Sequence, residues 1–203
     1  IVANDDNYGP VNGLEGDSNV GNVLVNDTLN GDSTTISDVT ISIVDPADSV
    51  NNGPVPSIDT ATGTVSVPAG TPAGSYEIEY QICEVLNPGN CDTAVATVIV
   101  EAAEIVANDD EYVAFDSKIG GTTASVLDND TLNGQSFNPS EITLTPGTSP
   151  NAGITMNDDG TISIVPGTPA GTYQYPYTIC EVLNPTNCDT AVATVVIDAA
   201  PAD

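Results

Sequence analysis

The chain has 203 residues, of which 29 are acidic and only one, Lys118, is basic, so its net charge is −28. This length suits two small domains of about 100 residues each. Such a charge excludes the basic surface that nucleic-acid binders need, and it argues against docking on anionic lipid. We therefore predict no nucleic-acid partner and no membrane insertion.

The acidity of the chain does not indicate disorder. Apolar residues make up 39% of the sequence, and many of them are Val and Ile in alternating runs. Chains that stay disordered lack such apolar content. No apolar run approaches the roughly 20 residues that span a membrane. Because the sequence does not begin with Met, we expect it to be an excerpt of a longer protein.

Four sequence blocks occur twice, in the same order. Ile-Val-Ala-Asn-Asp-Asp opens at Ile1 and again at Ile105. Further along, Asn-Asp-Thr-Leu-Asn-Gly opens at Asn26 and Asn129, Cys-Glu-Val-Leu-Asn-Pro at Cys83 and Cys180, and Cys-Asp-Thr-Ala-Val-Ala-Thr-Val at Cys91 and Cys188. Four ordered matches indicate a tandem repeat. We predict two domains, residues 1–104 and 105–203.

Short strand-like segments separated by turns fill each copy. In the first copy the expected strands include Val20–Val25, Ile36–Val44 and Gly63–Val67, followed by two longer segments. Tyr76, Ile78, Tyr80 and Ile82 alternate with polar residues, and so do Ala94, Ala96, Val98 and Val100. This period of two predicts half-buried strands, and no helical period persists. About seven such strands per copy predict an all-β fold of two immunoglobulin-like Greek-key β-sandwiches.

Two tyrosines follow Pro-Ala-Gly corners, Tyr76 in the first copy and Tyr173 in the second. Each is either a tyrosine-corner residue, whose hydroxyl bonds a backbone carbonyl a few residues upstream, or simply a core tyrosine. The sequence leaves both interpretations open.

Each copy contains one pair of cysteines separated by seven residues. Four cysteines allow three pairings, and the repeat symmetry favours Cys83–Cys91 and Cys180–Cys188. Both members of a pair are expected on the outward face, at the base of a hairpin. Without His the pair is a poor zinc site, so a disulfide is favoured over free thiols. Disulfides indicate an oxidising compartment.

Acidic and amide residues are expected to meet at one end of each sandwich. The first strand begins where the second strand ends, and the loop between the last two strands lies at the same end. The residues brought together in this way are Asp5, Asp6, Asn26, Asp27, Glu84 and Asp92, and in the second copy Asp109, Asp110, Asn129, Asp130, Glu181 and Asp189. Their oxygens suit Ca²⁺. The alternative is that they are solvated turn residues.

These repeated blocks resemble the cadherin-like and immunoglobulin-like tandem repeats of giant bacterial surface proteins, among them type IX-secreted adhesins of gliding bacteria. The resemblance covers both copies. It implies extracellular display at the cell surface, neighbouring repeats as partners, and calcium. The residues that match the acidic positions of the family are Asp5, Asp6, Asn26, Asp27, Asp109, Asp110, Asn129 and Asp130.

The resemblance also implies O-glycosylation at triplets of Asp, Ser or Thr, and an apolar residue. The matching threonines are Thr28, Thr60, Thr93, Thr131 and Thr190. At Asp27 and Asp130, a glycan on the next residue and a bound metal would compete for the same place.

The sequence argues against an enzyme because it has no His to act as a base and no Trp to form a sugar-binding platform. We predict structural stalk repeats of a bacterial surface adhesin or extracellular filament, stiffened by disulfides and calcium. Two alternatives stay open. One is a lectin-like adhesion module, which would need a recognition surface that differs from the repeat average, and the other is a strand-exchanging subunit of a fibre.

Overall fold

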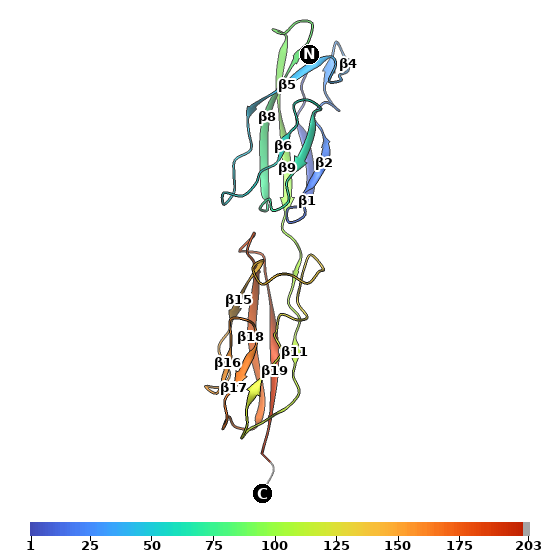
Figure 1. Ribbon diagram of the computed structural model, residues 1–203. Helices are drawn as coiled ribbons and strands as arrows, with labels where there is room; N and C mark the ends of the chain where they lie inside the picture. The colour runs from blue at the N-terminus through green and yellow to red at the C-terminus, as the bar shows by residue number, and fades with distance from the viewer. Residues whose placement is uncertain (201–203) are drawn as a thin grey trace. The chain divides into compact units, whose positions relative to one another are not determined.

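The computed structural model describes residues 1–200 and divides the chain into two compact units, Ile1–Ala103 and Glu104–Asp203. Every regular element among the described residues is a β-strand (Figure 1). No helix in this part of the chain has the length and apolar character of a membrane span. The predicted all-β fold class is confirmed.

The first unit is a sandwich of two main sheets. One has the strand order β1-β9-β8-β5 and the other β2-β7-β6, while β3 and β4 form a small hairpin between β2 and β5. The strands are β1 (Asp6–Asn12), β2 (Asp17–Asn22), β3 (Thr28–Leu29), β4 (Asp32–Ser33), β5 (Val39–Asp45), β6 (Ser57–Ile58), β7 (Thr64–Val67), β8 (Gly74–Glu84) and β9 (Cys91–Glu101).

The second unit repeats the order of the two main sheets, several of its strands are shorter, and β14 pairs with β10. Its larger sheet runs β11-β19-β18-β15, with β12 also on β19, and its smaller sheet runs β13-β17-β16. The strands are β10 (Ile105–Val106), β11 (Asp110–Glu111), β12 (Phe115–Asp116), β13 (Gly121–Thr122), β14 (Thr131–Leu132), β15 (Ile142–Pro146), β16 (Ile154–Met156), β17 (Ile162–Ile164), β18 (Gly171–Glu181) and β19 (Cys188–Asp198).

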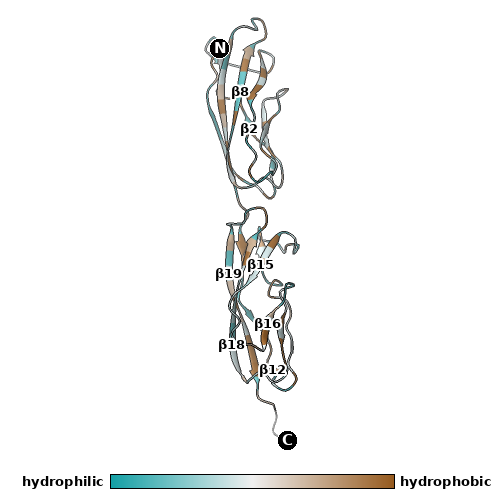
Figure 2. Cartoon of the chain, turned by 90° about the vertical axis from the view of Figure 1, so that its left-hand side faces the viewer, coloured by the Kyte–Doolittle hydropathy of each residue, from teal (hydrophilic) through white to brown (hydrophobic). Residues whose placement is uncertain are grey.

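The core of the first unit comes from the alternation seen in the sequence. Along β8 the buried side chains are Tyr76, Ile78, Tyr80 and Ile82, and along β9 they are Ala94, Ala96, Val98 and Val100, as predicted. Figure 2 shows such apolar residues recurring along the strands of both units. Burial of these aliphatic and tyrosine side chains is the main force that holds the two sheets together.

The first strand of each unit runs parallel to the last. In the first unit β1 pairs with β9 from Asp6↔Ala96 to Asn12↔Glu101, with an irregularity between Tyr8 and Val11. In the second unit the equivalent strand is split, so that β11 and β12 each pair with β19 separately. The opposite edge is also shorter there, because Pro176 stands where β8 has Glu79 and cannot donate a ladder hydrogen bond.

The second strand ends earlier than Val20–Val25, the range expected from its apolar residues. It stops at Asn22, whose side-chain Oδ1 accepts a hydrogen bond from the Leu24 amide at 3.0 Å. This turn competes with the ladder, as Asn side chains commonly do. Val23 and Leu24 therefore lie in a turn rather than in a strand, and their side chains are buried.

Both tyrosine corners are present. The Tyr76 hydroxyl donates to the Pro72 carbonyl at 2.7 Å, and the Tyr173 hydroxyl donates to the Pro169 carbonyl at 2.9 Å. Each bond ties the start of a long strand to the turn before it, so the tyrosine-corner interpretation is the correct one.

Candidate functional site

The acidic residues of the first copy hold the opening segment of the chain against the sandwich. The Asp92 carboxylate accepts from the Ala3 amide at 2.9 Å, Asp27 accepts from the Asn4 amide at 2.8 Å, and Asp5 accepts from the Val95 amide at 2.9 Å. These side chains come from the loop after β2, from β9 and from the opening segment itself. The predicted convergence of these elements at one end of the sandwich is therefore present.

Two asparagines complete this arrangement, which we call the acidic fastener: Asn4, Asp5, Asn26, Asp27 and Asp92. The Asn4 side chain donates to the Asn26 carbonyl at 2.8 Å, and the Asn26 side chain donates back to the Asp5 carbonyl at 3.0 Å. The fastener thus supplies hydrogen-bond partners for backbone groups that lie outside the regular strand ladder. Backbone N–H and C=O groups in folded proteins need such partners when they are shielded from water.

The second copy builds the same fastener from the matching residues. Asp189 accepts from the Ala107 amide, Asp130 from the Asn108 amide and Asp109 from the Val192 amide, at 2.7 to 2.9 Å. The amide side chains of Asn108 and Asn129 again bond the backbone of the opposite segment. The repeated Ala-Asn-Asp-Asp block is explained by these contacts.

A buried tyrosine lies beneath each fastener. The Tyr80 hydroxyl is within hydrogen-bonding distance of four oxygens: Asp6 Oδ2 at 2.9 Å, the Asn4 and Val23 carbonyls at 3.2 Å, and Asp27 Oδ2 at 3.4 Å. Tyr177 has the equivalent neighbours in the second copy. A hydroxyl supplies one proton, so a single tyrosine cannot donate to every one of these oxygens.

Burial raises the pKa of the acids in these clusters. Asp6 is 7% exposed and its pKa rises to about 6, mainly because burial disfavours the charged form and secondarily because Asp27 and Asp5 lie nearby. The hydrogen bond from the Tyr80 hydroxyl opposes this rise. The pKa of Asp110 rises to about 6 for the same leading reason, and burial also raises the pKa of Asp27 and Asp130.

In this structure the acids that were predicted to bind calcium make hydrogen bonds within the protein. The carboxylates of Asp5 and Asp27 accept from backbone amides, and those of Asp6 and Asp110 accept from tyrosine hydroxyls. Ca²⁺ binds ionised carboxylates, and with a pKa of about 6 Asp6 and Asp110 are mostly ionised at neutral pH. Within residues 1–200, no group of three or more His, Cys, Asp or Glu side chains is arranged to hold a metal ion. Calcium binding at these residues stays a prediction.

Glu84, which was expected at the same end, belongs to a different contact. Its carboxylate accepts from the side-chain amides of Asn87 at 2.6 Å and Asn90 at 2.9 Å, and these amides lower its pKa, Asn90 most. Glu181 accepts from the matching amides of Asn184 at 2.9 Å and Asn187 at 2.8 Å, both through Oε2, and its Oε1 is buried without a partner. Each Glu therefore closes its own hairpin loop, which accounts for the repeated Glu-Val-Leu-Asn-Pro-x-Asn sequence.

The predicted disulfides are present at the base of these loops. Cys83 bonds Cys91 and Cys180 bonds Cys188, and each pair lies directly opposite across the hairpin. Both pairs are on the outward face, as the alternation predicted.

The predicted glycosylation positions fall into two groups. Thr60, Thr93 and Thr190 are exposed, while Thr28 and Thr131 are partly buried beside the fasteners. Modification at these positions stays a prediction.

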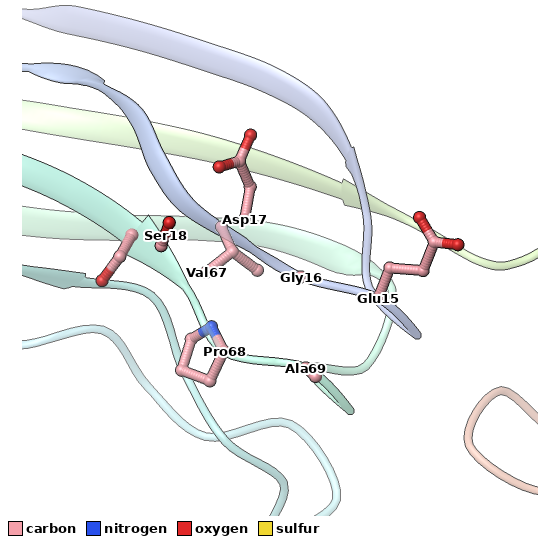
Figure 3. A pocket seen from close by; sticks show the side chains of 8 residues that line it. Glu15, Gly16, Asp17, Ser18, Val67, Pro68 and Ala69 are labelled. Atoms are coloured by element: carbon pink, nitrogen blue, oxygen red, sulfur yellow. The ribbon is translucent and has the colours of Figure 1, made fainter.

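A hollow of about 370 Å³ lies beside the turn between β1 and β2, where Gly16 has a positive φ of 69°. In Figure 3 the carboxylates of Glu15 and Asp17 lie well apart and do not point toward one another. The hollow therefore lacks the convergent polar groups of a binding site.

Comparisons with known proteins give only distant matches. No protein-family model and no curated protein match the chain. Similar solved structures include the human desmocollin-1 ectodomain, with 11% identity and a TM-score of 0.35 over 96% of this chain and 40% of that one. Mouse cadherin-23 EC22–24 has 11% identity and a TM-score of 0.36 over 79% and 53%, and human protocadherin-24 EC1–2 has 13% and 0.32 over 97% and 95%.

The chain spans about half or less of the desmocollin-1 and cadherin-23 structures it matches. Identities and TM-scores of this size do not assign a family, and the fold assignment rests on the strand order of the chain itself.

Proposed function

We propose that the chain is a pair of extracellular repeats that resist mechanical tension, of the kind that form the stalk of a bacterial surface adhesin or an extracellular filament. The observation that carries this proposal is the parallel pairing of the first and last strands in each unit. The proposed role is structural and involves no catalysis.

Parallel terminal strands resist a pull on the two chain ends. Because β1 and β9 run in the same direction, the chain enters the pair at one end of the sheet and leaves it at the other. Tension along the strands therefore loads several hydrogen bonds at once instead of breaking them one by one. The bond from the Gly13 amide to the Glu101 carbonyl at 2.9 Å extends this ladder to the end of β9.

Two further features support an exposed structural role. A disulfide at the base of each long hairpin suits an oxidising, extracellular compartment. The acidic fastener ties the opening segment of each copy to the sandwich through side chains, so this segment does not depend on ladder bonds alone.

Pulling single molecules by their ends tests the proposal. Alternate residues of a parallel strand direct their amides to the same neighbour, so Val11, two residues before Gly13, also faces β9. We expect Val11→Pro, which removes this amide, to lower the unfolding force of one of the two unfolding events strongly. The measurement is single-molecule force spectroscopy of the whole chain.

Ser42→Pro on the outer strand β5 is the matched control. It also places a proline in an edge strand, but β5 pairs only with β8 and does not connect to either chain end. Thermal melts show whether the two variants lose similar stability. If both lower the unfolding force equally, the terminal strands have no special mechanical role and the proposal is wrong.

Calcium is the predicted stiffening ion, and calorimetry tests it. A ligand that binds only the folded state at a hundredfold excess over its Kd stabilises that state by about 2.7 kcal/mol. If the predicted residues bind Ca²⁺, the melting temperature at neutral pH rises in calcium relative to chelator, and Asp5→Asn reduces the rise. An unchanged melting temperature means that these carboxylates act only within the fastener.

A further inference from the structure

The chain contains four Asn-Gly pairs, and the structure distinguishes one of them from the other three. They are Asn12-Gly13, Asn30-Gly31, Asn52-Gly53 and Asn133-Gly134. Such a pair is chemically labile, because glycine has no side chain to shield its amide nitrogen from the side-chain amide of the asparagine before it. The contacts of each pair in the fold decide whether the two groups can react.

The reaction converts asparagine to an acid and needs only water. The glycine amide nitrogen loses its proton to water or hydroxide and bonds the asparagine Cγ, the bond from Cγ to the side-chain nitrogen breaks, and ammonia leaves. The resulting cyclic imide then takes up water at either carbonyl. The product is aspartate, or isoaspartate, in which the backbone runs through the former side chain. The reaction therefore requires a free glycine nitrogen and an asparagine that can turn toward it.

In two of the four pairs the glycine nitrogen is already engaged. The Gly13 amide donates to the Glu101 carbonyl at 2.9 Å, and the Gly53 amide donates to the Val50 carbonyl at 2.9 Å. Gly13 is also closely packed, because a Cβ placed on it would overlap the Thr71 carbonyl oxygen. The fold therefore keeps both of these nitrogens from reacting.

The pair near the start of the second copy is held through its asparagine. The Asn133 amide donates to the Glu104 carbonyl at 2.6 Å, and Asn133 is partly buried. The flanking Leu132 and Gln135 bond each other through both their amides and their carbonyls. A change in the backbone angles of Asn133, which the attack by the Gly134 nitrogen needs, would disturb these bonds.

Asn30 and Gly31 lack such restraints. Both residues are exposed, and they form the turn between β3 and β4 with φ values of 56° and 85°. Two consecutive positive φ values are typical of a type I′ hairpin turn. Within residues 1–200, neither Asn30 nor Gly31 takes part in a hydrogen bond. A Cβ placed on Gly31 would meet nothing within 4 Å, so the space around its nitrogen is open.

The hairpin that carries this pair is short. β3 and β4 have two residues each, and both residues of β4 are exposed. A small hairpin of this kind contributes little stability of its own, and exposed segments with few contacts open locally at a low cost in free energy. Opening lets Asn30 leave its left-handed conformation and bring its Cγ to the Gly31 nitrogen.

We propose that Asn30 is a site of spontaneous deamidation, and that the other three Asn-Gly pairs are protected by the fold. Formation of isoaspartate lengthens the backbone of the turn and so disturbs the pairing of Leu29 with Asp32. The modification therefore alters the first copy with time and leaves the second copy intact. It is independent of the proposed mechanical role.

Incubation of the whole folded chain at physiological temperature and mildly basic pH, followed by digestion and peptide mass spectrometry, tests the proposal. The acid formed at each of the four pairs is measured over several weeks. We expect Asn30 to react about tenfold faster than Asn12, Asn52 and Asn133, because only its hairpin opens easily. In urea, where the fold no longer separates the pairs, the four rates are expected to agree within about threefold.

Gly31→Ala shields the attacking nitrogen and is expected to slow the reaction at Asn30. Gly134→Ala is the matched control, because Gly134 also has a positive φ and open space around it, and it is expected to leave the rate at Asn30 unchanged. Thermal melts show that both variants keep the fold. The proposal is overturned if Asn30 reacts no faster than the other three asparagines in the folded chain, or if Gly31→Ala leaves its rate unchanged.

Discussion

Acidification from pH 7.5 to about pH 4.5 is expected to stabilise this protein. Asp6 and Asp110 are buried against tyrosine hydroxyls, and the folded chain raises the pKa of each to about 6 from the ordinary value of 3.8. An acid whose pKa is raised on folding binds its proton more tightly in the folded state. Its contribution to stability is complete below pH 3.8 and is lost as the pH rises through about 6.

The size of the effect follows from the size of the shift. One pKa unit corresponds to 1.36 kcal/mol, so a rise from 3.8 to about 6 corresponds to about 3 kcal/mol for each copy. Burial also raises the pKa of Asp27 and Asp130, which adds to the effect in the same direction. Relief of the repulsion within a chain of charge −28 does so as well.

Asp6→Asn separates the buried acid from this general repulsion. The amide resembles the protonated acid in shape and charge, so the variant is expected to be more stable than the unmodified chain at pH 7.5 and about equal to it at pH 4.5. Urea unfolding followed by circular dichroism, in chelator and at several salt concentrations, gives both values. Glu77→Gln removes an exposed charge from β8 and serves as control.

Stability that falls steadily between pH 7.5 and pH 4.5 would contradict the prediction. So would a variant Asp6→Asn that is less stable than the unmodified chain at pH 7.5, because Asp6 would then be required in its ionised form.

Most of the framework was predictable because it depends on residue patterns that the sequence displays directly. The alternation at Tyr76–Ile82 and Ala94–Val100 specifies which faces of β8 and β9 are buried. That alternation also places Cys83 and Cys91 outward and opposite each other, so the disulfide followed from it. Topology alone brought Asp5, Asp27 and Asp92 to one end of the sandwich.

The missed contacts depend on where individual side-chain atoms meet. The pattern showed that Tyr80 points inward, but it did not show that the hydroxyl lies between Asp6 and Asp27. A signal was available, because a buried tyrosine hydroxyl needs a partner and both copies pair it with the same acids. Glu84 was misplaced because its partners, Asn87 and Asn90, lie in its own loop rather than across the sandwich.

Loss of the disulfide in either hairpin is expected to destabilise that copy by about 2 to 3 kcal/mol. The two cysteines of each pair are 8 residues apart, and closing a loop of this length lowers the entropy of the unfolded chain by about that much. Cys83→Ser with Cys91→Ser tests the first copy, and Cys180→Ser with Cys188→Ser tests the second. Urea unfolding of each double variant gives the loss.

The Glu–Asn hydrogen bonds inside each hairpin loop do not involve the cysteines. We expect Glu84 to keep its bonds to Asn87 and Asn90 after the bridge is removed, and Glu181 its bonds to Asn184 and Asn187, so that both hairpins keep their folded loops. The bridge then acts mainly on the unfolded chain, and the two copies are expected to lose similar amounts. Gln81→Ser with Thr93→Ser changes the next cross-strand pair on the same outward face and is expected to change stability by less than about 0.5 kcal/mol. If the cysteine variants change stability as little as this control pair does, the bridges contribute nothing beyond the clamped loops.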